Sequence, residues 1–178
     1  MLLGMTRGSS RIATAAIAAA FVACHSGHTL PLIPALDPVS WNSAPEFCTL
    51  VRWEDGDTPY VDCGAGAGPV RLLDIDTAES GFDDNSTKRG FWQAKLWQLP
   101  VDAVFACGRR ATARAREICP DGTQVELRGR ERDKYDRRLA YLRCLDVEVN
   151  AKLVREGHAG RYAYPKDPER PTLCERGF

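Results

Sequence analysis

The chain has 178 residues, of which 44% are hydrophobic and 27% are charged. This composition is typical of a soluble globular protein with about one domain, and it excludes wholesale disorder, collagen and a coiled coil. The basic and acidic residues number 24 each, so the formal net charge is zero. No overall positive field therefore attracts the chain to nucleic acid, and any such binding must come from local charge.

The N-terminal segment has the charged start, short apolar middle and small-residue end of a secretory signal. Arg7 and Arg11 precede the apolar run 12–23, which is shorter than the roughly 20 residues that a membrane-spanning helix needs. We therefore expect a signal peptide over residues 1–23 and no transmembrane segment in the mature chain. The mature chain is expected to be exported, as a secreted, periplasmic or outer-surface protein. The last residues of this region, Phe-Val-Ala-Cys, also resemble a lipobox, which leaves a lipid anchor at Cys24 as an open alternative.

The cysteines agree with an oxidising compartment. An even number remains after the signal region, which favours disulfides: Cys48, Cys63, Cys107, Cys119, Cys144 and Cys174. A zinc site is the competing interpretation, but the sequence has no C-x-x-C pair, and His158 is the only histidine beyond residue 28. We expect the cysteines to stabilise the fold rather than to take part in chemistry.

The rest of the chain predicts a spacer and one folded domain. Residues 24–46 contain four prolines among small and polar residues, which favours an extended spacer. The domain is expected over 47–178. The hydrophobic patterns predict strands near 47–53, 59–63, 70–76, 123–130 and 139–145, with helices near 108–118 and 148–156.

Residues 80–106 form a long connection between the third strand and the first of these helices. Trp92, Leu96 and Leu99 fall in it at helical spacing. This pattern favours a short helix that covers the core. The alternative is a platform on which nucleic-acid bases stack.

Charge is distributed unevenly along the chain. Residues 37–84 hold 11 acids and 2 bases, whereas residues 109–138 hold 10 bases and 6 acids. An acidic half beside an arginine-rich half could bind a cation and a phosphate together. Most of these charges, taken singly, are expected to be solvated surface.

The register of a predicted hairpin brings two acids together. Gly64-Ala-Gly-Ala-Gly68 lies between two strand-like runs, which indicates a hairpin turn rather than a nucleotide-binding loop. If the turn is centred near 66.5, Asp57 lies directly across from Asp76, with their Cβ atoms about 5 Å apart. Two ionised carboxylates there repel each other, and a hard cation such as calcium would relieve the repulsion.

The turn before this strand, Asp55-Gly-Asp57, also presents two carboxylates at one end of the sheet. An EF-hand is excluded, because its twelfth loop position would be Gly66. The same register argument sets Cys48 across from Cys63 in the first hairpin, where they can form a disulfide. Cys107 and Cys119 would be about 18 Å apart along a helix and should not pair with each other.

Three separated motifs stand in order along the chain: Asp55-Gly-Asp-Thr58, Val70-Arg-Leu-Leu-Asp-Ile-Asp-Thr-Ala-Glu79 and Asp133-Lys-Tyr-Asp-Arg-Arg-Leu-Ala-Tyr141. With the Leu-Val-Arg-Glu-Gly157 stretch and a tyrosine-bearing segment after it, they resemble the staphylococcal nuclease (thermonuclease) family over about residues 47–166. The resemblance implies an α+β fold, an OB-type five-stranded β-barrel with helices packed on it, which agrees with the strand count. Segment 80–106 is then an insertion that is longer than the family's usual loop.

The resemblance also implies roles for individual residues. Asp57 and Asp76 would bind calcium through carboxylate oxygens and Thr77 through its backbone carbonyl. Arg71 and Arg137 would bind phosphate, since a planar guanidinium suits the charge of a phosphoryl transition state. Glu79 matches the carboxylate that is usually considered the general base, and Lys134, Tyr135 and Tyr162 or Tyr164 match positions that contact nucleotide phosphate and base.

The match has departures and one geometric requirement. Ala78 replaces the usual proline, Pro59 follows the first motif, and Asp136 stands where the family commonly has glycine, a position that favours glycine if φ is positive. Strict alternation along a strand puts Arg71 and Asp76 on opposite faces, so the strand must bend for the two to converge.

These observations and the resemblance together predict an exported, calcium-dependent nuclease that hydrolyses DNA and RNA. The resemblance implies that its products end in 3′-phosphate. We expect it to act as a monomer. The first alternative is an OB module of the same family that binds nucleic acid without cutting it. The second is an exported scaffold protein that calcium stabilises, although this leaves the two matched arginines unexplained.

Overall fold

The structure is a computed structural model that describes residues 44–163 and 166–174. The predicted signal peptide, Cys24, the spacer up to residue 43 and Tyr164 lie outside the described residues. Within the described part of the chain, no helix is long and apolar enough to cross a membrane.

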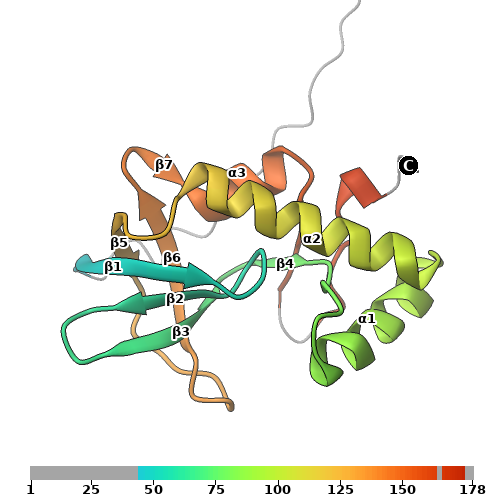
Figure 1. The fold of residues 1–178 in the computed structure, drawn as a ribbon, viewed down its shortest axis with the longest axis horizontal. Coiled ribbons are helices and arrows are strands. Elements are labelled where there is room, and N and C mark those ends of the chain that lie inside the picture. The colour runs from blue at the N-terminus through green and yellow to red at the C-terminus, as the bar shows by residue number, and fades with distance from the viewer. Residues whose placement is uncertain (1–43, 164–165, 175–178) are drawn as a thin grey trace, which may run out of the picture. The chain divides into compact units, whose positions relative to one another are not determined.

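Five strands form a closed barrel (Figure 1). They are β1 (Glu46–Trp53), β2 (Pro59–Asp62), β3 (Ala67–Leu72), β5 (Gln124–Arg128) and β6 (Arg138–Cys144). Antiparallel neighbours follow the order β3-β2-β1-β5-β6, and a parallel pairing of β3 with β6 closes the barrel. The predicted five-stranded barrel of OB type is confirmed.

Three helices and some short elements complete the fold. The helices are α1 (Asp84–Trp97), α2 (Val101–Ile118) and α3 (Val149–Arg155). The short strand β4 (Ile75–Thr77) pairs with β8 (Ala159–Arg161), β7 (Val147–Glu148) pairs with β6, and the 3-10 turn η2 (Thr172–Cys174) follows. In Figure 1, α2 runs along the molecule from the barrel to α1, and β4 lies between the barrel and α1.

Local sequence explains why segment 80–106 is helical. The Asp83 side chain accepts hydrogen bonds from the backbone N–H groups of Asn85 and Ser86, and Ser86 closes the capping box. Helix α1 ends at Trp97 and is capped by Gln98, which has a left-handed backbone, and α2 begins directly after Pro100. The predicted helix in this segment is thus present, and the helix predicted to begin near residue 108 already begins at Val101.

The register predicted for the second hairpin is wrong. Asp62 pairs with Ala67 and Tyr60 with Pro69, so the turn is centred near 64.5 instead of 66.5. The cause is the Asp62 carboxylate, which accepts hydrogen bonds from the N–H groups of Gly64 and Gly66 and fixes a shorter turn. As a result Asp57 lies across from Leu72, whose N–H donates to the Asp57 carbonyl at 2.9 Å, and not directly across from Asp76.

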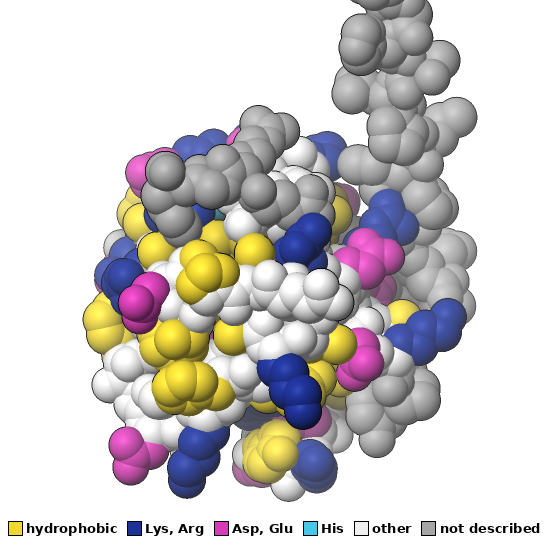
Figure 2. Space-filling view, turned by 90° about the vertical axis from the view of Figure 1, so that its right-hand side faces the viewer, with side chains coloured by type: hydrophobic (Ala, Val, Ile, Leu, Met, Phe, Trp, Pro, Cys, Tyr) yellow, Lys and Arg dark blue, Asp and Glu magenta, His cyan; other side chains and the backbone are white. Residues whose placement is uncertain are grey.

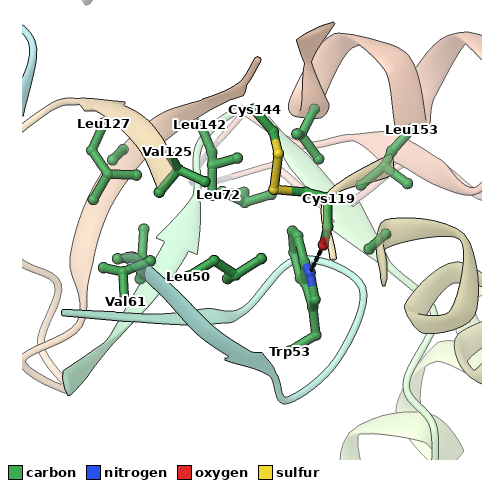
Figure 3. Packing of buried hydrophobic residues seen from close by; sticks show 14 of the residues in the cluster. Leu50, Trp53, Val61, Leu72, Cys119, Val125, Leu127, Leu142, Cys144 and Leu153 are labelled. Atoms are coloured by element: carbon green, nitrogen blue, oxygen red, sulfur yellow. Dashed lines mark hydrogen bonds between the residues drawn. A yellow bond between two sulfur atoms is a disulfide. The ribbon is translucent and has the colours of Figure 1, made fainter. Parts of the chain in front are cut away.

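The barrel interior is filled by aliphatic side chains, cysteines and one tryptophan (Figure 3). Leu50, Leu127 and Leu142 are fully buried, and Trp53 donates its indole N–H to the Cys119 carbonyl at 2.9 Å. Because this carbonyl is at the C-terminal end of α2, the bond fastens the helix to β1.

The structure pairs Cys48 with Cys63, Cys107 with Cys174 and Cys119 with Cys144. The first pair is the one that the register of the first hairpin predicts, and Cys107 and Cys119 have separate partners, as expected. Glu46 lies beside the first pair, and the potential ligand atoms of these three residues lie within 4.8 Å of one another. The two sulfurs are bonded to each other, so this cluster is not a metal site.

Candidate active site

Part of the predicted site comes together where β3 bends into β4: Asp57, Arg71, Asp76, Thr77 and Glu79. Asp74, between the two strands, has a left-handed φ of 61°. The bend is held by Tyr141, whose hydroxyl donates to the Asp74 carboxylate, and by Asn150, whose amide donates to the Leu73 carbonyl at 2.9 Å. This is the bend that alternation along a single strand requires if Arg71 and Asp76 are to meet.

Asp57 is held rigidly in the loop between β1 and β2. Its Oδ2 accepts hydrogen bonds from the Thr77 backbone N–H at 2.6 Å and from the Thr77 hydroxyl at 3.0 Å. Its Oδ1 accepts from the Thr58 hydroxyl at 3.2 Å. The Asp57 side chain is only 2% exposed, so these bonds fix a carboxylate that has almost no contact with water.

Arg71 joins the two aspartates. From β3 its guanidinium contacts Oδ1 of Asp57 and Oδ1 of Asp76, and it also donates to the Ile75 carbonyl at 3.1 Å. Asp76 is 1% exposed. Both carboxylates therefore face one shared guanidinium, which offsets the repulsion that the sequence predicts between them.

Helix α1 adds two residues that the sequence analysis missed. Arg89 lies 2.7 Å from Oδ1 of Asp76 and 2.7 Å from Oε1 of Glu79. Gln93 is fully buried, and its side-chain amide forms hydrogen bonds with Asp76, Thr77 and Glu79. The only signal in the sequence was their spacing of four, which puts two long polar side chains on one side of a helix.

The hydrogen bonds of Gln93 use both ends of its amide. Nε2 donates to Oδ2 of Asp76 at 3.1 Å and to the Thr77 carbonyl at 3.0 Å, while Oε1 accepts from the Glu79 backbone N–H at 2.8 Å. Gln93 thus fixes the relative positions of the three residues of the Asp76–Glu79 segment that the sequence analysis singles out.

Burial changes the acidity of the site. Burial raises the pKa of Glu79 to about 7, and the negative charges of Asp55 and Asp76 add to the effect while Arg89 opposes it. The pKa of Asp55, whose carboxylate accepts the Asp57 backbone N–H at 3.0 Å, is also raised by burial, against the effect of Arg71. A carboxyl group with a pKa near neutrality is suited to accept a proton.

The charges of this cluster fit a divalent cation. Four carboxyl groups, on Asp55, Asp57, Asp76 and Glu79, surround the guanidinium groups of Arg71 and Arg89, which leaves two negative charges in excess when all four are ionised. The donor atoms are all oxygens, as calcium prefers. Burial is the main cause of the raised pKa values of Asp55 and Glu79, and the neighbouring carboxylates add to it. The residues present therefore fit the calcium ion that the resemblance implies.

Arg137 is close to this cluster without touching it. It lies just before β6, where its guanidinium binds the Asp133 carboxylate at 2.7 Å, and its charge acts on Asp55. Tyr135 lies in the same loop, with the Lys134 ammonium 5.0 Å and the Arg137 guanidinium 5.5 Å from its ring centre. Asp136 has a φ of 63°, the left-handed conformation in which glycine is favoured.

Two further elements support the site. Tyr162 follows β8 and donates its N–H to the Asp74 carbonyl at 3.0 Å, and it is near enough to Arg89 to act on it electrostatically. Gly108 of α2 lies against the backbone of Ala78 and Glu79: a Cβ there would be 2.3 Å from the Glu79 carbonyl oxygen. Close approach of α2 to the Glu79 backbone thus depends on this glycine.

Comparison with known proteins identifies the family of the chain. The model of the family described as "Staphylococcal nuclease homologue" matches residues 69–175. Two curated relatives from Bacillus subtilis (strain 168), the SPbeta prophage-derived endonuclease YokF and the endonuclease YncB, are 36% and 35% identical over 122 residues, 67% of this chain. The match covers 35% and 49% of these two relatives, so the chain spans less than half the length of either. Because the family model matches more than half of the sequence, the chain belongs to the family of staphylococcal nuclease homologues.

Proposed function

We propose that this protein is an exported, calcium-dependent nuclease that hydrolyses phosphodiester bonds of DNA and RNA and leaves 3′-phosphate ends. The observation that carries the proposal is the buried carboxylate cluster with its excess of two negative charges, directly beside the Arg71 and Arg89 guanidinium groups. Such a site can hold a cation and the phosphate of a substrate together. The names of the two relatives, both endonucleases, support the same reaction.

The proposed calcium ligands are the carboxylates of Asp57 and Asp76 and the carbonyl of Thr77. When bound, calcium would neutralise phosphate charge and lower the pKa of water. Arg71 and Arg137 bind the phosphate oxygens on which charge develops during attack. For Arg137 this means exchanging its ion pair with Asp133 for one with the substrate.

Glu79 is the proposed general base. It takes a proton from water as the water oxygen forms a bond to phosphorus. The bond between phosphorus and the 5′ oxygen breaks, that oxygen gains a proton, and the products are a 3′-phosphate and a 5′-hydroxyl. A pKa of about 7 makes Glu79 able to accept and release a proton near neutral pH.

Lys134, Tyr135, Tyr162 and Tyr164 are the proposed contacts to nucleotide phosphate and base. Tyr135 is exposed, so it can stack on a base without rearrangement of the core. His158 has no part in the reaction, because its charged neighbours lie outside the carboxylate cluster: Glu156, Arg114, Arg110 and Glu117.

The test is cleavage of single-stranded DNA by the full chain with calcium and with a chelator, for the wild type and for Glu79→Gln. We expect cleavage only with calcium and a loss on the order of a hundredfold or more in Glu79→Gln. The matched control is Glu117→Gln on the exposed surface of α2, which should cut like the wild type. Products should carry 5′-hydroxyl groups that accept labelled phosphate from a kinase. A wild type that binds the DNA with calcium but does not cut it would instead identify a binding module.

A further inference from the structure

One flank of α1 is open to solvent beside the carboxylate cluster. The buried residues of α1 form a single stripe: Gly90, Gln93, Ala94 and Trp97. On one side of this stripe, Phe91 meets the Phe105 ring of α2 edge-on at 6.3 Å. Arg89 and Trp92 are three residues apart and lie on the other side, so α2 does not cover them.

Trp92 adjoins the candidate active site through Arg89. The Arg89 guanidinium is 5.3 Å from the centre of the Trp92 ring, within the range of a cation–π contact, and 2.7 Å from both Asp76 and Glu79. Trp92 is 41% exposed. The Trp92 ring is thus in contact with water, and only the Arg89 side chain separates it from Glu79, the proposed general base.

The surroundings are those of a surface that binds a charged, partly apolar ligand. Tyr162 acts electrostatically on the same Arg89, so a second aromatic residue lies near the guanidinium. Figure 2 looks onto the side of the molecule on which α1 lies in Figure 1, and hydrophobic side chains gather there among basic and acidic ones. Phe82, Phe91 and Trp92, from α1 and the segment before it, are among the exposed large hydrophobic residues.

We propose that Arg89 and Trp92 form a subsite for one unpaired nucleotide of a single-stranded nucleic acid, in which Arg89 binds a phosphate and the Trp92 indole stacks on the base. The proposal rests on the proposed function, because it places this nucleotide next to the one that is cut. A nucleotide is the ligand that this position favours, because the Arg89 guanidinium that would bind its phosphate is already part of the candidate active site.

This subsite distinguishes single strands from duplexes. In a duplex the bases stack on one another and are paired inside the helix, so none is free to cover Trp92, whereas an unpaired base can rotate onto the ring. The insertion 80–106 would then determine that single-stranded nucleic acid is the preferred substrate.

The experiment measures binding of a fluorescent ten-nucleotide single-stranded DNA to the full chain in the presence of a chelator, which prevents cutting. The variants are Trp92→Ala and Trp92→Phe, with Phe47→Ala, an exposed aromatic on β1, as the matched control. We expect about a tenfold weaker Kd for Trp92→Ala, most of the affinity restored in Trp92→Phe, and no change in Phe47→Ala. A blunt duplex of equal length should bind wild type and Trp92→Ala within about twofold of each other. Thermal melting verifies that each variant is folded.

The outcomes separate this proposal from the proposed function. If the wild type binds and, with calcium, cuts the oligonucleotide while Trp92→Ala binds within twofold of it, the subsite is overturned and the nuclease remains. If Trp92→Ala weakens single-stranded and duplex DNA equally, selection for unpaired bases is overturned. A wild type that neither binds nor cuts nucleic acid overturns the proposed function and the subsite with it.

Discussion

Gln93→Leu is expected to destabilise the protein and to disorder the site at the same time. The side chains have similar volumes, so the change removes hydrogen bonds without opening a large cavity. The bond to the Asp76 carboxylate is worth about 2 kcal/mol and those to the Thr77 carbonyl and from the Glu79 N–H about 1 kcal/mol each, because all three groups stay buried and lose a partner. The expected loss in the free energy of unfolding is therefore about 4 kcal/mol.

Urea unfolding of the metal-free protein with its disulfides intact measures this loss. The fluorescence of the buried Trp53 and Trp97 reports the transition. Gln124→Leu on β5, at an exposed position, is the matched control and should change the free energy of unfolding by less than about 0.5 kcal/mol.

Turnover should fall as well, on the order of a hundredfold, because Glu79 and Asp76 lose the bonds that hold them in place. Gln93→Glu provides a second perturbation: it keeps an acceptor for the Glu79 N–H but adds a negative charge beside Asp76, so it should be at least as harmful. A loss of stability below about 1 kcal/mol together with normal turnover in Gln93→Leu would refute the role assigned to this side chain.

Three further predictions follow from the same region. In the absence of metal, the Glu79 carboxyl binds a proton more tightly in the folded state than in the unfolded state. The free energy of unfolding should therefore decrease as the pH rises from about 4.5 to 7. The shift of the Glu79 pKa from 4.5 to about 7 corresponds to at most about 3 kcal/mol. Urea unfolding of wild type and Glu79→Gln across this range measures the effect, and an identical pH dependence in both would contradict it. Gly108→Ala should cost about 2 kcal/mol or more and lower turnover, because its Cβ would displace the Glu79 backbone; a stable, fully active variant would show that α2 can yield. Asp136→Gly should raise the urea midpoint by the equivalent of about 0.5 kcal/mol, since glycine adopts the left-handed backbone more readily; a lower midpoint would mean that the surface ion pair of Asp136 with Arg132 matters more than backbone strain.

Much of the barrel and the identity of its acidic residues could be predicted from the sequence. Strand patterns are local, and the spacing of Asp57, Arg71 and Asp76 is a property of the chain itself. Which residues lie across from the acids could not be predicted. The Asp62 carboxylate shortens the glycine-rich turn by accepting hydrogen bonds, and a register that assumes a symmetric turn does not include these bonds. The sequence alone does not decide whether Asp136 has a positive φ, and in the structure its φ is positive.

The contribution of α1 could not be predicted for a different reason. Its helical spacing was visible, but which face of a helix meets the site depends on how it packs against the rest of the protein. In the structure Phe91 of α1 meets Phe105 of α2, and in this orientation of α1 Arg89 contacts Glu79 and Gln93 contacts Asp76. Trp92 was expected to cover the core, and the structure instead leaves it exposed, while Trp97 takes the buried position.

The parallel pairing of β3 with β6 determines when the site can exist during folding. Arg71 pairs across from Leu139 in this contact, and the residues joined by it are far apart in the chain, so the contact is among the slower ones to form. Until it forms, Arg71 on β3 and Arg137 beside β6 lie at opposite ends of the strand order β3-β2-β1-β5-β6. A nascent or partly folded chain therefore contains the residues of the site without the site itself, and its chemistry begins only with the complete barrel.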